Sequence, residues 1–321
     1  MAARWTYETA LHDIGNGLFA YLQPDGGWGW SNAGLIVDGE QSLLVDTLFD
    51  MKLTAEMLAS MRDAAGVAGP DINTVVNTHA NGDHTHGNGC CPTAEIVASE
   101  ASAREMTEIS AAMLSQIMAA APGMGDTGAY LSEIFGNFDF AGVQERLPTR
   151  TFSGTLDLQV GDKPVRLIEV GPAHTAGDVL VHVPRDRAVF TGDILFIDGT
   201  PIMWAGPVSN WIAACEMITA MDVDVIVPGH GPMTDKAGVR RVSEYLSYID
   251  REARKRFDAG MDPREAVHDI ALGEYSSWGD AERIAVNVDT LYREYRGGGE
   301  PTPVTELFGL MAQVRKARRS A

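Results

Sequence analysis

Four short apolar segments of this chain are each followed, within a few residues, by a histidine or an aspartate. In chain order, the polar residues after these segments are His79, His174, Asp193 and His230. Short apolar runs bounded by turn residues are typical of buried strands, and the carboxyl ends of strands in an α/β sheet are where loops present side chains to a cleft. The pattern predicts an α/β domain that gathers imidazole and carboxylate groups at its strand ends.

The loop expected after the first of these strands is the richest in possible metal ligands. Within eight residues it carries His79, Asn81, Asp83, His84 and His86. Imidazole and carboxylate ligands suit Zn²⁺, and Fe or Mn become alternatives as the number of oxygen ligands increases. Together with the residues that follow the other strands, this loop predicts a site for one or two metal ions.

The histidine-containing blocks resemble the metal shell of the metallo-β-lactamase superfamily, and the resemblance covers about residues 15–236. It implies an α/β fold, the αββα sandwich of that superfamily, with two metal ions that share a water molecule. The ligand set that it implies is His79, Asn81 and His174 for the first ion, Asp83, His84 and His230 for the second, and Asp193 as a bridge between them.

Two positions depart from the family pattern, in which the first block usually reads His-x-His-x-Asp-His. Asn81 stands where most members have a histidine, and His86 stands where a glycine is common. An amide oxygen is a weaker ligand for Zn²⁺ than an imidazole nitrogen, so the first site is expected to bind its metal more loosely, to prefer a harder ion, or to stay empty. His86 either lines the pocket or supplies a nitrogen ligand or a general acid. Asp46 is expected to support the ligands without being one.

The chain is expected to divide into a catalytic domain, residues 1–236, and a helical C-terminal extension, residues 237–321. The extension is expected to cap the main domain or to dimerise. Three glycines at positions 297–299 break its helical pattern before a short tail, and the basic run at residues 315–319 is expected to be solvated.

A Met-rich helical insertion is expected at about residues 100–140. Met106, Met113 and Ile117 fall on one helical face, and the helix is expected to end before Pro122. This helix either packs into the core or forms a pliable apolar wall over the site, because Met side chains adapt to irregular ligands.

The net charge and the composition indicate which classes of partner and which location to expect. The net charge is −19, with 44 acidic and 25 basic residues, and nucleic-acid surfaces are normally basic, so no nucleic-acid partner is expected. No run approaches the ~20 apolar residues of a membrane span, and the N-terminus does not resemble a signal peptide. With three cysteines, of which Cys90 and Cys91 are expected to pack as small hydrophobic residues, the composition fits a cytoplasmic protein.

The function favoured by these residues is hydrolysis of a small, largely apolar ester, lactone or thioester. A metal-bound hydroxide would attack the carbonyl carbon, with Asp83 orienting the nucleophile or accepting its proton and His86 as a second possible catalytic group. The side chains expected to bind this small-molecule substrate are Trp28, Trp30, Met113 and Trp204.

Two other classes of function remain open from the sequence. An iron-dependent, non-hydrolytic enzyme, such as an oxygenase, a lyase or a decarboxylase of a biosynthetic pathway, would suit the oxygen donor of Asn81. A non-catalytic binding module is disfavoured because Asp83, His84, His174 and the other implied ligands are retained. The chain is also a possible homo-oligomer.

Overall fold

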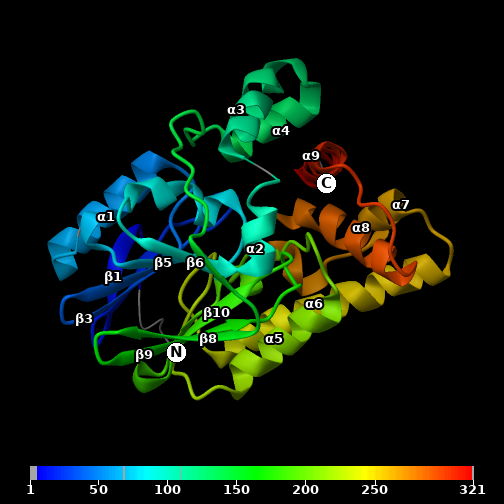
Figure 1. The fold of residues 1–321 in the computed structure, drawn as a ribbon. Helices are drawn as coiled ribbons and strands as arrows, with labels where there is room; N and C mark the ends of the chain where they lie inside the picture. Colours follow the sequence, from blue (N-terminus) through cyan, green and yellow to red (C-terminus); the bar gives the residue numbers. More distant parts are fainter. Residues whose placement is uncertain (1–5, 68, 109, 320–321) are drawn as a thin grey trace.

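Two mixed β-sheets lie face to face on one side of the molecule, with the C-terminal helices on the other (Figure 1). The structure, a computed structural model, describes residues 6–67, 69–108 and 110–319. The first sheet runs in the order β1 (Ala10–Gly15), β2 (Leu18–Leu22), β3 (Ala33–Asp38), β4 (Gln41–Val45), β5 (Thr74–Val76), β6 (Glu95–Ser99) and β7 (Arg150–Phe152). The second runs in the order β12 (Val225–Val227), β11 (Ala188–Phe190), β10 (Val179–Val183), β9 (Lys163–Glu169) and β8 (Thr155–Val160).

Alternating side chains on the strands of the first sheet explain why it is covered on both faces. Ile36 and Leu43 point toward the second sheet and pack against residues such as Val181, whereas Leu35 and Leu44 point to the opposite face. Successive side chains of a strand face opposite sides of a sheet, so a strand that is apolar at every position needs partners on both sides. The first sheet therefore lies between the second sheet and a helix.

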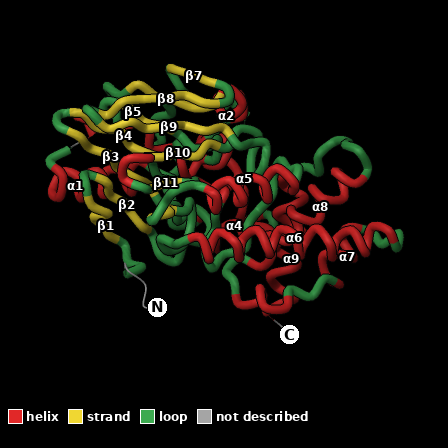
Figure 2. The backbone as a smooth tube through the Cα atoms, turned by 90° about the horizontal axis from the view of Figure 1, so that it is seen from below, coloured by secondary structure: helices red, strands yellow, loops and turns green. Residues whose placement is uncertain are grey.

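Helices form the two outer layers. Helix α1 (Met51–Ala65) covers the first sheet through Met57, Leu58 and Met61. Residues from α5 (Val208–Ala220), α6 (Lys236–Asp258) and α8 (Ile284–Tyr295) pack in one apolar cluster with the second sheet. The remaining helices are α2 (Glu100–Glu105), α3 (Ala111–Ala120), α4 (Gly125–Phe135), α7 (Pro263–Asp269) and α9 (Val304–Arg319). The predicted αββα sandwich with C-terminal helices is confirmed, and Figure 2 shows these helices beside the strands.

Gly34 on β3 shows how closely the two sheets approach each other. A Cβ atom at this position would lie 2.2 Å from a ring carbon of Phe190 on β11. Only glycine leaves space for the Phe190 ring at this point of the core. Among the described residues, no helix combines the length and the hydropathy that crossing a bilayer requires.

Two expectations from the sequence are corrected by the structure. The single helix expected across Met106, Met113 and Ile117 is interrupted: α2 ends at Glu105, and α3 starts again after Ser110, whose side chain accepts a hydrogen bond from the Met113 amide. Ser side chains favour this helix-starting position because they satisfy a free amide of the first turn.

The second correction concerns the C-terminus. The short tail expected after Gly299 contains the 16-residue helix α9. Lys316, Arg318 and Arg319 of its basic run are exposed, as expected, whereas Arg315 is half-buried and pairs with Glu133 of α4. Leu307, Leu310, Met311 and Val314 are buried on one side of α9. The helix therefore packs on the domain, and Figure 1 shows it beside α4.

Candidate metal centre

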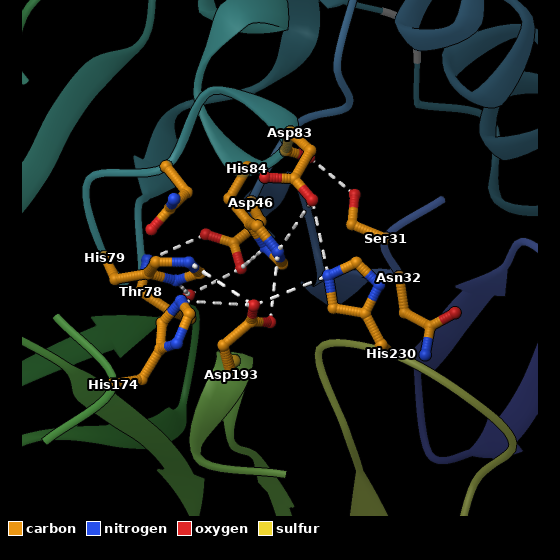
Figure 3. A network of polar contacts seen from close by, with 12 residues as sticks. Ser31, Asn32, Asp46, Thr78, His79, Asp83, His84, His174, Asp193 and His230 are labelled. Carbon is orange, nitrogen blue, oxygen red and sulfur yellow. Dashed lines mark hydrogen bonds and ion pairs between the residues drawn. The ribbon is translucent and has the colours of Figure 1, made fainter. Parts of the chain in front are cut away.

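The candidate ligands come from both sheets and meet at one end of the sandwich (Figure 3). His79, Asp83 and His84 lie in the loop that follows β5 of the first sheet. His174 lies between β9 and β10, and Asp193 and His230 follow β11 and β12 of the second sheet. A candidate ligand thus follows each of these strands, which is the placement that the sequence pattern predicted.

Asp193 lies at the centre of the four imidazoles. Its Oδ2 atom is 3.4 Å from Nε2 of His174, 3.4 Å from Nε2 of His230 and 3.7 Å from Nε2 of His79. Its Oδ1 atom is 3.2 Å from Nε2 of His84. One carboxylate thus reaches all four histidines, which is the arrangement expected of a bridging ligand.

Asp83 forms a second cluster with two of these imidazoles. Its Oδ2 atom lies 3.3 Å from Nε2 of His230 and 3.9 Å from Nε2 of His84. Possible ligand atoms within 4.8 Å of one another thus form two groups, His79 with His84 and Asp193, and Asp83 with His84 and His230. The two groups share His84, so they are adjacent parts of one centre.

Each imidazole is held by its other ring nitrogen. Nδ1 of His84 lies 2.9 Å from the Asp46 carboxylate, that of His174 lies 2.6 Å from the Ile202 carbonyl, and that of His230 lies 3.0 Å from the Gly26 carbonyl. Nδ1 of His79 lies 3.0 Å from the Thr78 hydroxyl, whose proton goes to Asp46. Since these acceptors take the Nδ1 proton, Nε2 is the nitrogen left to bind a metal once any proton on it has been released. The supporting role predicted for Asp46 agrees with this contact.

Several polar atoms of the centre are buried without a hydrogen-bond partner. They are Nε2 of His79, His84 and His174, Oδ1 of Asp193 and Oδ1 of Asn81. Buried polar atoms are rarely left without a partner unless an ion or water satisfies them. The histidine and aspartate atoms among them lie close together and are of the kinds that bind Zn²⁺, Fe or Mn, so the residues present fit a metal centre.

The pKa values of these groups depend on burial and on their mutual charges. Burial lowers the pKa of His79 and of His174. Burial also acts to lower the pKa of His84 and His230, but the nearby carboxylates outweigh it and raise both, that of His230 to about 9. Metal binding must displace protons from these two imidazoles, so metal affinity is expected to rise with pH.

The two positions that depart from the family pattern lie in the same loop. The Asn81 amide oxygen is buried and free for a ligand, as described above. The His86 ring stacks on Phe49 with ring centroids 5.5 Å apart, and its Nδ1 has no hydrogen-bond partner. A Cβ at Gly82 would lie 2.4 Å from the His86 ring, so glycine at 82 allows the ring to take this place. Whether His86 takes part in chemistry stays a prediction.

The residues expected to bind substrate lie in two different environments. Trp28, Trp30 and Trp204 are half-buried and pack against the apolar cluster beside the centre. Met113 lies on α3 and is 45% exposed. Cys90 is half-buried and Cys91 buried, and neither is in a disulfide.

Sequence reasoning missed several aromatic residues of this region. Phe49 contacts His86, Phe138 and Phe140, and Phe308 of α9 contacts Trp28. Phe49 follows the end of β4, so the same strand-end argument that identified the ligands could have found it. Phe308 had no such signal, because its neighbours are distant in the sequence.

Asp178, which follows His174 in the sequence, is expected to make the free energy of unfolding depend on pH. It is buried and accepts hydrogen bonds from the Thr175 amide and hydroxyl, and burial raises its pKa to about 8. An unfolded aspartate titrates near pH 3.9, so the stability that comes from protonated Asp178 is complete below about pH 4 and is lost as the pH rises toward 8. Asn does not titrate, so Asp178→Asn is expected to reduce the fall in the free energy of unfolding between pH 5 and pH 8.

Urea unfolding at both pH values measures this effect, which is expected to exceed about 1 kcal/mol. The exposed carboxylate of Asp63 provides the control, Asp63→Asn, which should leave the pH dependence unchanged. Equal pH dependence in the parent and Asp178→Asn would show that Asp178 is ionised in the folded protein throughout this range.

Comparison with known proteins agrees with this geometry. The sequence model of the metallo-β-lactamase superfamily matches residues 26–230. The chain is 30% identical over 84 residues to the β-lactamase-like protein 2 homolog of Caenorhabditis elegans, a match that covers 26% of this chain and 28% of that protein. The matched segments span only 26% to 36% of the lengths of the curated relatives.

Solved structures of low sequence identity share the fold. The sec-alkylsulfatase Pisa1 from Pseudomonas sp. superposes with a TM-score of 0.65 at 14% identity, over 92% of this chain and 52% of that one. A metallo-β-lactamase from Pontibacter korlensis gives a TM-score of 0.55 at 18% identity, over 75% of this chain and 99% of that one. Since the family match extends over more than half of the residues and spans every candidate ligand, the chain belongs to the metallo-β-lactamase superfamily.

Proposed function

We propose that this protein is a metal-dependent hydrolase of a small carboxylic ester, lactone or thioester that carries an apolar group. The observation that supports this function is the set of four buried imidazoles, each anchored through Nδ1 and each with Nε2 within 3.7 Å of the Asp193 carboxylate. His79, Asn81 and His174 would hold one ion and Asp83, His84 and His230 the other, with Asp193 between them. Bound metal ions supply Lewis acidity, which lowers the pKa of a water molecule and polarises a carbonyl group.

Asp83 is the residue of this chain placed to handle the proton of the nucleophile. Its side chain is 14% exposed, against 4% or less for His84, His230 and Asp193, so it lies on the solvent side of the centre. The Ser31 hydroxyl donates to the Asp83 carbonyl and fixes this part of the loop. The imidazoles hold the pKa of the Asp83 carboxyl well below its usual range against the opposing effect of burial, so it is ionised and able to orient a water molecule.

The apolar part of the proposed substrate follows from the surroundings of the centre. Trp28, Trp204 and Phe49 lie beside it, and the aromatic cluster to which they belong is a surface for an apolar acyl or alcohol group. The net charge of −19 would repel a polyanionic substrate. We therefore propose a small-molecule partner and no nucleic-acid partner.

A substrate screen with defined metal content tests this proposal. The metal-free protein would be reconstituted with Zn²⁺, Mn²⁺ or Fe²⁺ and assayed on an aryl ester, a lactone, an acyl thioester and an alkyl sulfate. The proposal expects metal-dependent turnover of at least one acyl substrate. An alkyl sulfatase is among the similar structures. Metal-dependent hydrolysis of the alkyl sulfate alone would therefore contradict the proposed carboxylic ester, lactone or thioester substrate, although the protein would still be a hydrolase.

A second function, iron-dependent chemistry without hydrolysis, is supported by the free oxygen of Asn81. Oxygen donors favour harder ions, and a buried amide oxygen without a partner shifts the first site away from Zn²⁺. Metal analysis of protein purified without added metal separates the two functions. Iron with a visible absorption band and no hydrolysis would favour the second one.

Replacement of Asn81 tests the first site directly. Asn81→His is expected to raise the Zn²⁺ content retained after dialysis against a chelator, because an imidazole nitrogen replaces a weaker oxygen donor. Asn81→Ala, which has no donor, is expected to retain less Zn²⁺ than the parent. Metal analysis of the three proteins would contradict the assignment if all three retained the same amount, because Asn81 would then not contact the metal.

A further inference from the structure

The ring of Phe308 on α9 lies between two tryptophans from distant parts of the chain. Its centroid is 5.7 Å from that of Trp28 and 6.4 Å from that of Trp204. Phe135 of α4 completes the group, 5.9 Å from Phe308 and 5.8 Å from Trp28. Four segments that are separate in sequence thus bring aromatic rings to one place, and one of these segments is the C-terminal helix.

The backbone near each tryptophan contacts a different candidate ligand of the metal centre. The Trp204 amide donates to the carbonyl of His174, a candidate ligand of the first ion. Trp28 is two residues after Gly26, whose carbonyl accepts from Nδ1 of His230, a candidate ligand of the second ion. Because Phe308 contacts both rings, α9 is linked through them to a candidate ligand of each ion.

The orientation of Trp28 is fixed by charged residues of the C-terminal region. Its Nε1 donates to the Glu282 carboxylate at 3.4 Å, and the Arg283 guanidinium lies 4.5 Å from its ring centroid. Glu282 and Arg283 are 4% and 2% exposed, so they hold the ring from the buried side. A ring held in this way presents a fixed aromatic surface, at little further cost in entropy when a ligand binds.

The aromatic cluster is only partly covered by the rest of the protein. Phe135 is buried, whereas Trp28, Trp204 and Phe308 are only half-buried. Aromatic rings gain most from a partner that is also aromatic, in offset-stacked or edge-to-face contact. An incompletely covered set of fixed rings beside the metal ligands is therefore suited to a planar aromatic group.

We propose that Phe308, together with Trp28 and Trp204, forms a subsite for a planar aromatic group of the substrate, so that α9 helps to determine specificity. This inference rests on the proposed function, since it assumes that the reacting group of the substrate binds at the metal centre. It assigns to the C-terminal region a direct contact with substrate, beyond the expected capping or dimerisation. Glu282 acts as a positioning residue through Trp28.

Direct binding of a non-reacting acid tests the subsite. The probe is 2-naphthoate, which carries a planar aromatic group and a carboxylate for the metal centre, and octanoate is the alkyl comparison. Isothermal titration calorimetry on the full-length, Zn²⁺-loaded protein would compare the parent with Phe308→Ala and Phe308→Leu. The matched control is Phe257→Ala, because Phe257 is a half-buried aromatic residue of the same region that packs on Tyr292 and Tyr295 instead.

The parent is expected to bind 2-naphthoate more tightly than octanoate. Phe308→Ala is expected to raise the Kd for 2-naphthoate about tenfold, with a smaller change for octanoate and a change below about twofold in Phe257→Ala. Phe308→Leu keeps apolar volume and tests the loss of the ring even where the alanine variant does not fold. The subsite is overturned if the parent does not bind 2-naphthoate, if it prefers octanoate, or if folded Phe308 variants bind 2-naphthoate as the parent does.

Binding is measured without turnover, so the two proposals can fail separately. If the protein binds 2-naphthoate through Phe308 but hydrolyses no ester, lactone or thioester, the subsite is supported and the proposed reaction is contradicted. If the protein hydrolyses these substrates but the Phe308 variants bind 2-naphthoate as the parent does, the reaction is supported and the subsite is contradicted.

Discussion

Replacement of Asp193 by asparagine is expected to remove most of the bound metal and to lower kcat/KM for an accepted substrate at least about 1000-fold, which corresponds to about 4 kcal/mol of transition-state stabilisation. Asp193 is the carboxylate that lies within 3.7 Å of all four imidazoles. Asparagine has almost the same shape but no charge, so the substitution removes the group that would bridge two ions and changes the packing very little. Metal analysis and steady-state kinetics measure the two effects.

The matched control for this variant is Asp198→Asn. Asp198 is five residues further along the chain, and its side chain is 66% exposed and pairs with Arg241 at 3.8 Å. Its replacement is expected to leave both metal content and kcat/KM within twofold of the parent. If Asp193→Asn kept its full metal content and normal turnover, the central position assigned to Asp193 would be wrong.

Replacement of Arg283 by methionine is expected to lower the free energy of unfolding by about 3 kcal/mol. Arg283 is 2% exposed, donates to the Thr200 carbonyl and pairs with Asp280 at 3.0 Å. Its guanidinium also lies over the rings of Trp28 and Phe196. Methionine fills part of the space but leaves the Thr200 carbonyl without this partner and the Asp280 carboxylate with only the longer, 3.8 Å contact to Arg315, and such poorly paired buried groups are costly.

Urea unfolding at pH 7 measures this loss of stability. The control is Arg264→Met, since Arg264 is on the surface, where it pairs with Glu306, and both side chains are more than half exposed. An exposed ion pair contributes less than about 1 kcal/mol, so the control should unfold nearly as the parent does. A loss below about 1 kcal/mol in Arg283→Met as well would contradict the role given to this buried charge.

The positions of the candidate ligands could be predicted from the sequence because the signal for each is local. A short apolar strand followed by a polar residue needs no knowledge of distant contacts, and this holds for His79, His174, Asp193 and His230 alike. The sandwich itself follows from the same strands, which are apolar on both faces and so need cover on both sides. The family resemblance then supplied the proposed assignment of these residues to two ions.

The last helix lies in the extension that was expected to be helical, but its packing was missed although part of its signal was present. Leu307, Leu310, Met311 and Val314 recur at helical spacing and are buried in the structure, but the preceding glycines and the basic end suggested a solvated tail. The residues that pair with its Arg315, Glu133 and Glu282, lie 182 and 33 positions away. Partners at such distances leave no pattern within a window of the sequence, so the packing of the helix could not be inferred.

The aromatic cluster was only partly predicted for the same reason. Trp28, Trp30 and Trp204 stood out as large residues near the candidate ligands, whereas Phe308 contacts Trp28 and Trp204 from a helix that is distant from both in the sequence. A single sequence shows which residues are aromatic and does not show which of them meet. The contacts therefore required the structure.

Metal titration of the metal-free protein, followed by hydrolysis at each step, tests the central claim most directly. Zn²⁺, Mn²⁺ and Fe²⁺ would be added in separate series, and turnover of an aryl ester, a lactone and an acyl thioester would be recorded together with bound metal. The proposed function predicts no turnover without metal, binding of up to two ions per chain, and hydrolysis that increases with occupancy. Turnover by the metal-free protein, or metal bound stoichiometrically with no hydrolysis of any of these substrates in any series, would contradict it.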